Sequence, residues 1–380
     1  MTFSLPKHNV VTGRGSTAIY LLLKHLAESA ERTMELLAPV NICYAALYPA
    51  LYAGWSIRFI DVSPLDGNIT ADAVREAFGE RVPDALIAAH MYGQPMAELP
   101  EIADLCRRQG VVLVEDCACA MGATSDYPLG TMGDYTVYST GYAKVVDLGY
   151  GGILASEVHD LDWVEPMLSA LPVRSDDGEL TETLFSKIYR ALRSFPDGAL
   201  DAAIYLTLPD ASRRAFIYRL DEEGERTVRR ALTTVDEIAD AKRRLFRSCK
   251  QLWEQNWQNW GRGQSVDSEI DIEKREKRGR GQSVGFRVFP YTEGAVPWRF
   301  SFFVEPQMHK PIIDACLAAG VPISDWYPSV APMFGDAGDY PGAQSMEASI
   351  LNLPLNDDAL SSTIPEVIAI VAKMEKGMRI

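Results

Sequence analysis

VVLVEDCACAMGA, at residues 111–123, decides the fold of this chain. Its apolar run leads without interruption into Glu115 and Asp116, which is typical of a strand buried on both faces of a parallel sheet. The sequence therefore predicts two carboxylates at the carboxyl end of a buried strand. Open α/β sheets bind their ligands at that edge, so Asp116 is a candidate binding residue.

Helix and strand patterns alternate on both sides of this stretch. Helical spacing of apolar residues, with stops at Gly54 and Gly110, separates shorter apolar runs that are typical of strands. The predicted helices cover residues 14–28, 41–54 and 99–110, and the predicted strands cover 33–40, 56–62, 84–91, 111–118, 135–140 and 151–156. This order predicts an α/β fold with a largely parallel sheet between layers of helices.

The C-terminal part of the chain has a different pattern. An amphipathic stretch over 231–257 predicts a long helix that joins two domains. The hexapeptide GRGQSV then occurs at 261–266 and again at 279–284. We interpret that segment as a solvated surface loop or duplicated insertion rather than as a functional arm. Strand and helix patterns in the remaining residues predict a smaller mixed α/β domain.

The composition is that of a folded, soluble protein. Of the 380 residues 47% are hydrophobic, and 37 Lys and Arg against 52 Asp and Glu give a formal net charge of −15. An acidic surface of this kind repels nucleic-acid phosphates and anionic lipids. No apolar run reaches the length of about 18 residues that spans a bilayer, and the first residues do not read as a secretion signal. We therefore expect a cytoplasmic protein without nucleic-acid or membrane partners.

The six cysteines are scattered among apolar segments, so we expect reduced thiols rather than a disulfide framework. Cys117 and Cys119 form a C-x-C pair. Zinc usually takes four ligands, or three and a water, and two further ligands do not stand near this pair in the sequence. We predict no metal site.

Asp116 and Lys144 are the main candidates for chemistry. Burial of a carboxylate is unfavourable unless the carboxylate has a partner. A protonated pyridine nitrogen is one possible partner for Asp116, and a helix cap or a structural ion pair is the alternative. Lys144 lies in the apolar, glycine-rich stretch GYAKVVDLGYGG at 141–152. Partial loss of solvation lowers the pKa of a lysine there, and its neutral amine can form a Schiff base with an aldehyde. An ordinary solvated lysine is the alternative.

A third group of residues is suited to binding a phosphate. Gly15, Ser16, Thr17 and Ala18 open a predicted helix, where free backbone N–H groups and the helix dipole favour an anion, although simple helix capping is the alternative. The hydroxyl of Ser139 is a further anion donor. A phosphate cradle, a carboxylate for a pyridinium and an amine for a Schiff base together point to pyridoxal phosphate.

Motifs along almost the whole chain resemble the DegT/DnrJ/StrS aminotransferases, a family of fold-type I pyridoxal-phosphate enzymes that mostly aminate nucleotide-linked keto sugars. The arrangement of VED at 114–116 and SxxxxK at 139–144 is the most specific part of the resemblance. The other matching stretches are GSTAIYLLL at 15–23, residues 37–64 and 88–123, LGTMGDYTVYSTGYAKVVDLGYGGIL at 129–154, GVPISDWYP at 320–328 and ILNLPLNDD at 350–358.

The resemblance implies roles for individual residues. Lys144 would hold the cofactor as an internal aldimine and Asp116 would pair with its pyridine nitrogen, so these two are the expected catalytic residues. The expected cofactor-binding set is Ser16, Thr17, Ala18, Cys43, Asp116, Cys119, Ser139 and Lys144. His90, Trp326 and Tyr327 would approach the substrate; for His90 a hydrogen-bonded core histidine is the alternative, and for the two aromatics ordinary packing.

The resemblance also implies the fold and the reaction. We expect a large cofactor-binding domain over 1–230, with a mostly parallel seven-stranded sheet, and a linking helix with a small α/β domain over 231–380. Family members that dehydrate their substrate have histidine in place of the lysine, so Lys144 favours transfer of an amino group, with glutamate as the donor and a keto sugar as the acceptor. The alternatives are a pyridoxal-phosphate enzyme that acts on a non-sugar substrate and a binding or regulatory protein. Enzymes of this fold usually form two-fold dimers, so we expect a homodimer.

Overall fold

The computed structural model describes residues 2–175, 183, 210–260, 286–356 and 358–378. The chain divides into two compact units. The first comprises residues 1–241, 291–298 and 327–346, and the second comprises 242–290, 299–326 and 347–380. Three separate stretches of sequence thus build the first unit, which contains Asp116 and Lys144.

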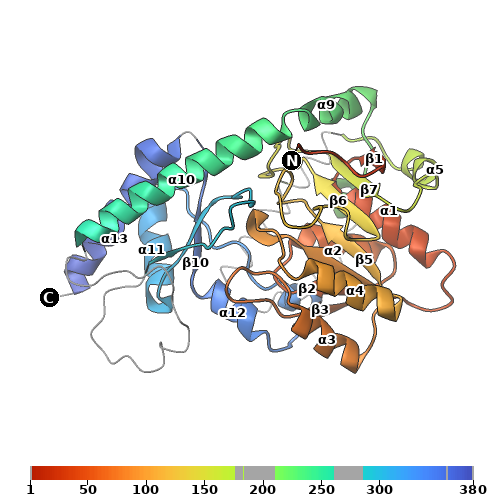
Figure 1. The fold of residues 1–380 in the computed structure, drawn as a ribbon, viewed down its shortest axis with the longest axis horizontal. Helices are drawn as coiled ribbons and strands as arrows, with labels where there is room; N and C mark the ends of the chain where they lie inside the picture. The colour runs from red at the N-terminus through yellow and green to blue at the C-terminus, as the bar shows by residue number, and fades with distance from the viewer. Residues whose placement is uncertain (1, 176–182, 184–209, 261–285, 357, 379–380) are drawn as a thin grey trace. The chain divides into compact units, whose positions relative to one another are not determined.

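A seven-stranded sheet forms the centre of the first unit, with the order β1-β7-β6-β5-β4-β2-β3 (Figure 1). Its strands are β1 (His8–Thr12), β2 (Glu35–Pro39), β3 (Ser56–Ile60), β4 (Ala85–Ala89), β5 (Val112–Asp116), β6 (Tyr135–Ser139) and β7 (Gly152–Ser156). The pairs from β3 through β2, β4 and β5 to β6 are parallel, whereas β7 runs antiparallel to both β6 and β1. The predicted α/β fold with a mostly parallel seven-stranded sheet is confirmed.

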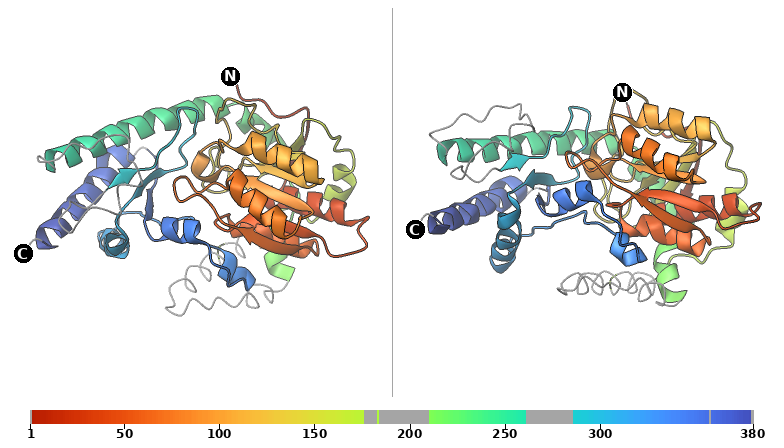
Figure 2. Two further views of the ribbon diagram at one scale, coloured as in Figure 1. Left: turned by 60° about the horizontal axis from the view of Figure 1, so that its bottom comes forward. Right: turned by 90° about the horizontal axis from the view of Figure 1, so that it is seen from below.

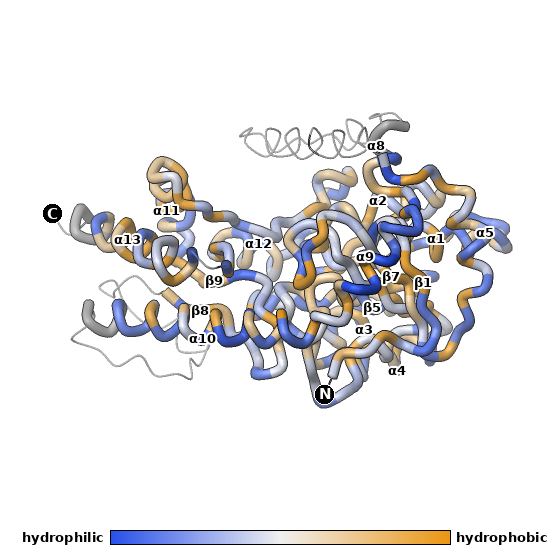
Figure 3. The backbone as a smooth tube through the Cα atoms, turned by 90° about the horizontal axis from the view of Figure 1, so that it is seen from above, coloured by the Kyte–Doolittle hydropathy of each residue, from blue (hydrophilic) through white to orange (hydrophobic). Residues whose placement is uncertain are grey.

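Helices cover both faces of this sheet. In Figure 3, α1 (Gly15–Ala27) and α2 (Tyr44–Tyr52) lie on one side of the strands, and α3 (Ala71–Glu80) and α4 (Leu99–Gln109) lie on the other. The glycine stop of α4 is confirmed, since Gly110 has the left-handed φ of 69°.

Helix α3 was not predicted from the sequence. Its four buried residues, Ala71, Val74, Ala77 and Phe78, stand at helical spacing, so an apolar period was present in the sequence. A second signal was its cap: the side chain of Thr70 accepts a hydrogen bond from the N–H of Ala73. The other helices of the first unit are α5 (Val164–Ser169), α8 (Asp210–Phe216) and α9 (Glu222–Leu232), with short 3₁₀ turns at Met91–Gly93 and Ala331–Phe334.

The second unit contains a three-stranded antiparallel sheet in the order β10-β9-β8. These strands are β8 (Arg287–Val288), β9 (Phe300–Phe303) and β10 (Ile350–Leu353), and the unit also contains α11 (Pro306–Ala318) and α13 (Ile364–Met378) (Figure 2). The predicted long helix is α10 (Val235–Trp260), which begins in the first unit and continues into the second. Its Trp253 packs on Phe302, with ring centroids 4.6 Å apart. Helix α12 (Pro341–Glu347) is short, and both GRGQSV repeats lie outside the described residues.

Within the described part of the chain, none of the helices combines the length and the apolar character that crossing a bilayer requires.

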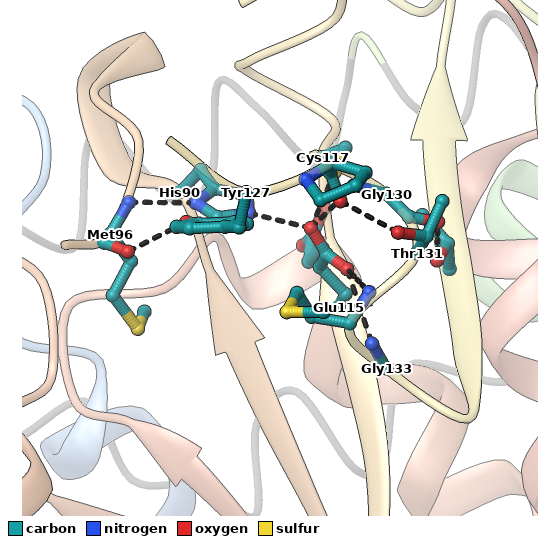
Figure 4. Close-up of polar contacts among 12 residues, drawn as sticks. His90, Met96, Glu115, Cys117, Tyr127, Gly130, Thr131 and Gly133 are labelled. Atoms are coloured by element: carbon teal, nitrogen blue, oxygen red, sulfur yellow. Dashed lines mark hydrogen bonds and ion pairs between the residues drawn. The ribbon is translucent and has the colours of Figure 1, made fainter. Parts of the chain in front are cut away.

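Glu115 connects β5 to the loop that precedes β6. One carboxylate oxygen accepts the N–H of Gly130 at 2.6 Å, and the other accepts those of Met132 and Gly133 at 2.9 and 3.2 Å (Figure 4). His90 Nε2 lies 3.0 Å from the same carboxylate. The side chain is fully buried, so the contacts replace the solvation that burial removes.

The same contacts determine the ionisation of Glu115. Burial alone raises the pKa of this carboxyl group, but the hydrogen bond and charge of His90 and the N–H groups of Gly130 and Met132 outweigh it, so the pKa lies below its usual range. A lowered pKa in the folded state stabilises the fold above the pKa of the unfolded chain, about 4.3 for glutamate. This contribution is lost as the pH falls through the folded pKa.

We expect Glu115→Gln to lower the free energy of unfolding at pH 7 by about 3 kcal/mol, because an amide cannot accept these donors as a carboxylate does and leaves buried N–H groups poorly paired. The loss is expected to shrink as the pH falls below the usual pKa of glutamate and through the lowered pKa of the folded carboxylate. Urea denaturation at several pH values measures both effects.

The matched control is Glu222→Gln, because Glu222 pairs with Arg226 on the surface and its side chain is 92% exposed. We expect less than about 0.5 kcal/mol from it. Equal losses in the two variants would contradict a special role of Glu115.

Candidate active site

Asp116 is the last residue of β5, at the carboxyl edge of the sheet. It is 8% exposed, and its Oδ1 accepts the N–H of Ala118 at 2.8 Å. Burial raises the pKa of this carboxyl group, although the N–H of Ala118 and the positive charge of Lys144 act in the opposite direction. A cation beside Asp116 would therefore stabilise the charged form of its carboxyl group.

Lys144 follows β6, and its amino group lies 3.3 Å from Sγ of Cys119. From the sequence we expected its pKa to fall, and this expectation was wrong. Burial does lower the pKa of Lys144, but the acidic groups of Cys119, Cys43 and Asp116 attract the ammonium ion more strongly than burial penalises it, and the pKa lies above its usual range. The sequence did not reveal this attraction because Cys43 is about 100 residues from Lys144.

The start of α1 and Ser139 lie side by side. A Cβ atom placed on Gly15 would be 3.4 Å from Cβ of Ser139 and 3.7 Å from its hydroxyl oxygen, so a larger residue at position 15 would narrow this space. The first hydrogen bond within α1 runs from the N–H of Ala18 to the carbonyl of Arg14. The earlier N–H groups have no partner inside the helix and are suited to an anion.

The hydroxyls of Ser16 and Thr17 contact backbone carbonyls about 200 residues away in the sequence. Ser16 donates to the carbonyl of Phe216 at 2.7 Å, and Thr17 contacts the carbonyls of Phe216 and Tyr218 at 3.1 and 3.2 Å. They tie α1 to the segment after α8. The N–H groups of the first turn, rather than these hydroxyls, are therefore the donors suited to an anion here.

Arg14 adds a positive charge at the same place. It is the N-cap residue of α1, and one guanidinium nitrogen lies 3.9 Å from where a Cβ on Gly141 would be, in the loop after Ser139. Its other terminal nitrogen donates to the carbonyl of Ala215 at 3.4 Å. Arg14 was not predicted from the sequence, although a cation directly before a helix start that is suited to phosphate was a usable signal.

Cys119 and Cys43 lie near the amino group of Lys144, and Tyr327 lies next to Cys119. The hydroxyl of Tyr327 lies 3.7 Å from Sγ of Cys119, and its backbone N–H donates to the hydroxyl of Tyr92 at 2.9 Å. Cys43 is the N-cap of α2, and burial raises the pKa of its thiol although the nearby charge of Lys144 acts in the opposite direction. Tyr327 thus contacts the residue that itself contacts the amine of Lys144.

The backbone N–H of His90 donates to the carbonyl of Asp116 at 3.0 Å, but the ring of His90 has other partners. The ring of His90 is buried, its Nε2 pairs with Glu115, and its Nδ1 accepts the N–H of Met96 at 3.0 Å. This geometry matches the alternative of a core histidine. Trp326 belongs to the second unit, where its carbonyl accepts a hydrogen bond from Asn352 at 2.6 Å.

His90, Glu115 and Cys117 also bring three metal-binding atom types within 4.8 Å of one another. Glu115 is already occupied by backbone donors, and Cys117 donates to it at 3.7 Å. Burial and the neighbouring carboxylates raise the pKa of the Cys117 thiol well above its usual range, whereas a metal needs the thiolate. We therefore assign the cluster to the packing of β5.

Comparison with known proteins supports the sequence resemblance. Residues 2–183 match the model of the DegT/DnrJ/EryC1/StrS aminotransferase family. A pleiotropic regulatory protein of Geobacillus stearothermophilus is 31% identical over 163 residues, which is 42% of each chain. The dTDP-3-amino-3,4,6-trideoxy-alpha-D-glucose transaminase of Micromonospora megalomicea subsp. nigra is 29% identical over 239 residues, or 62% of this chain and 54% of that protein. The chain thus matches only about two fifths to one half of the length of these relatives.

Similarity of fold extends much further than similarity of sequence. PseC of Helicobacter pylori, an aminotransferase involved in the biosynthesis of pseudoaminic acid, superposes with a TM-score of 0.69 over 97% of this chain and 88% of that one, at 13% identity. This likeness concerns the fold alone. The sequence match over residues 2–183 thus makes this part of the chain similar to the DegT/DnrJ/EryC1/StrS aminotransferase family, and the fold of the chain is that of PseC.

Proposed function

We propose that this protein is a pyridoxal-phosphate-dependent aminotransferase that transfers an amino group, with glutamate as the donor, to a keto sugar carried on a nucleotide. The observation that supports it most directly is the convergence of Lys144, Asp116 and the start of α1 in one unit of the fold. Residues suited to form a Schiff base, to pair with a ring nitrogen and to bind a phosphate thus lie in the same unit of the fold.

The residues fit this cofactor. Asp116 is a buried carboxylate at the carboxyl edge of the sheet, and burial raises its pKa, so it gains from a cationic partner such as a protonated ring nitrogen. When bound, the cofactor withdraws electrons from the carbon that loses a proton. Asp116 supports this by keeping the ring nitrogen protonated.

The phosphate would be held at the start of α1. The N–H groups at the first turn, the hydroxyl of Ser139 and the guanidinium of Arg14 provide donors and positive charge there. Ser16 and Thr17 support this site by fixing α1 to the carbonyls of Phe216 and Tyr218. Arg14 has a particular importance in a chain with a net charge of −15, because it supplies a local attraction for an anion.

Lys144 would have two tasks. Its amine would hold the cofactor, and when free it would take up and return the proton of the α-carbon of the amino donor. The raised pKa of Lys144 comes in part from Asp116. A cation paired with Asp116 removes part of that attraction, so binding of the ring favours the neutral amine that the reaction needs. Cys119 and Cys43 would line the cofactor beside Lys144.

The acceptor and the assembly are proposed from the relatives. The Micromonospora relative is named as a transaminase of a dTDP-linked sugar, which supports a nucleotide-linked keto sugar as the acceptor. Tyr327, beside Cys119, is our candidate for a substrate contact. We further propose a cytoplasmic homodimer, with residues 1–230 as the cofactor-binding domain and 231–380 as the small domain with its linking helix.

Lys144→Ala is expected to abolish covalent capture of the cofactor. The wild type, incubated with pyridoxal phosphate and reduced with borohydride, should carry the label on the peptide that contains Lys144. The release of 2-oxoglutarate from glutamate should fall at least about a thousandfold in the variant, because the residue that moves the proton is gone. Peptide mapping by mass spectrometry and a single-turnover assay measure the two effects.

Lys24→Ala is the control, because Lys24 is an exposed lysine of α1. If the wild type and Lys144→Ala were labelled equally, Lys144 would not be the residue that binds the cofactor. A wild type that retains no cofactor would favour the binding or regulatory alternative, a role that the Geobacillus relative bears in its name. Retained cofactor with turnover of non-sugar carbonyl compounds only would favour the alternative reaction.

Asp116→Asn is expected to weaken binding of pyridoxal phosphate by about tenfold to a hundredfold, since a neutral amide replaces a charge-assisted hydrogen bond to the ring. The cofactor-free variant should be at least as stable as the wild type, because burial of a carboxylate is removed. Fluorescence titration and thermal denaturation give the two numbers.

Asp134→Asn provides the comparison, because Asp134 also accepts a backbone N–H at 2.8 Å, that of Leu113, away from Lys144. Its cofactor affinity should remain that of the wild type. A loss of stability in Asp116→Asn without a loss of affinity would show that Asp116 is only a structural residue.

A further inference from the structure

Two residues other than glycine have a left-handed backbone in the described part of the chain. They are Tyr92, with φ of 58°, and Ala143, with φ of 57°. Such residues are strained and persist only where surrounding contacts hold them, and they gather at functional sites. Ala143 directly precedes Lys144, so the conformation of its backbone determines where the side chain of Lys144 starts.

Trp298 contacts both strained residues. Its indole N–H donates to the carbonyl of Ala143 at 2.6 Å, and its backbone N–H donates to the carbonyl of Tyr92 at 3.0 Å. The ring is 6% exposed and packs near Tyr327, with centroids 5.0 Å apart. Trp298 is 155 positions from Ala143 in the sequence, and it links the loop that carries Lys144 to Tyr92 and Tyr327.

Trp298 is itself held firmly. The N–H of Val296 donates to the carbonyl of Gly93 at 3.0 Å, so residues 296–298 run beside Tyr92 and Gly93. A Cβ on Gly93 would be 2.0 Å from the carbonyl oxygen of Val296 and 3.0 Å from that of Cys119, so this approach requires glycine. The indole is thus anchored to the backbone beside Cys119, the residue that contacts the amine.

We propose that Trp298 is a positioning residue for Lys144, which acts by holding the strained backbone of Ala143 through its indole N–H. The inference rests on the proposed function only for the use of Lys144, since the geometry itself needs no cofactor. On the other side of the residue, the N–H of Ala143 donates to Asp147 at 2.8 Å. Without the indole bond the carbonyl of Ala143 loses its partner, the backbone relaxes toward the right-handed region, and Lys144 leaves Cys119.

The experiment measures the reactivity of Lys144 in the protein without cofactor. Competitive labelling with acetic anhydride, read by mass spectrometry, gives the rate at Lys144 relative to exposed Lys24 in the same molecule. In Trp298→Phe we expect the relative rate at Lys144 to rise about tenfold, because the amine loses its contacts and becomes accessible. A variant with 3-benzothienylalanine at position 298, which keeps the ring shape and lacks the N–H, should show the same rise and guards against misfolding of the phenylalanine variant.

Trp55→Phe is the matched control. Trp55 is 3% exposed and its indole N–H donates to the carbonyl of Leu23 at 2.9 Å, so it loses the same kind of bond away from Lys144. We expect no change in the relative rate at Lys144, whatever its effect on stability. An equal rise in Trp55→Phe, or no rise in either variant at position 298, would overturn the proposal.

Ala143→Gly provides the rescue. Glycine adopts a left-handed φ without strain, so the loop has less reason to relax when the indole bond is missing. In the double variant Trp298→Phe with Ala143→Gly, the rate at Lys144 should return to within about threefold of the wild type. A double variant as reactive as Trp298→Phe alone would show that strain at Ala143 is not the link.

The result is independent of the proposed reaction. Labelling of Lys144 is measured without cofactor, whereas the proposed function is tested by borohydride capture of pyridoxal phosphate. If capture fails and the labelling pattern holds, the function is wrong and the positioning role stands. If capture occurs in the wild type and labelling does not respond to Trp298→Phe, only the positioning role is wrong.

Discussion

Two consecutive carboxylates at the end of β5 organise the first unit. Successive residues of a strand point to opposite faces, so Glu115 and Asp116 are directed into different surroundings. Glu115 is paired with backbone N–H groups and His90, which fixes the loop leading to β6. Asp116 has the N–H of Ala118 and the charges of Lys144 and His90 to offset its burial, and its pKa is still raised. The fold satisfies one carboxylate and leaves the other dependent on a cation.

The separation in sequence between interacting residues decides which features could be predicted. The strands and the helices α1, α2 and α4 were predictable, because hydrophobic periodicity and glycine stops are local signals. The burial of Asp116 at the end of β5 was also predictable, since its apolar surroundings are visible in the sequence. The partners of Glu115 and the bond from Trp298 to Ala143 were not, because they join residues that are separated by 15 to 155 positions.

The pKa of Lys144 also depends on residues that are distant in the sequence. The pKa of Lys144 was expected to fall because only burial could be inferred from its neighbours in the sequence. In the fold, acidic groups from α2, from the residues after β5 and from β5 itself surround the amine and raise its pKa. The charge state of a buried amine therefore depends on which distant segments the topology brings to the carboxyl edge of the sheet.

The bonds from Ser16 and Thr17 to the carbonyls of Phe216 and Tyr218 have a consequence for synthesis of the chain. All seven strands of the large sheet have left the ribosome once Ser156 has emerged. The start of α1, however, is secured only about sixty residues later, and the carbonyl of Ala143 meets its indole partner later still, at Trp298. Since domains fold as units during synthesis and the first unit also contains residues 291–298 and 327–346, the contacts of this unit are complete only after Met346 has emerged.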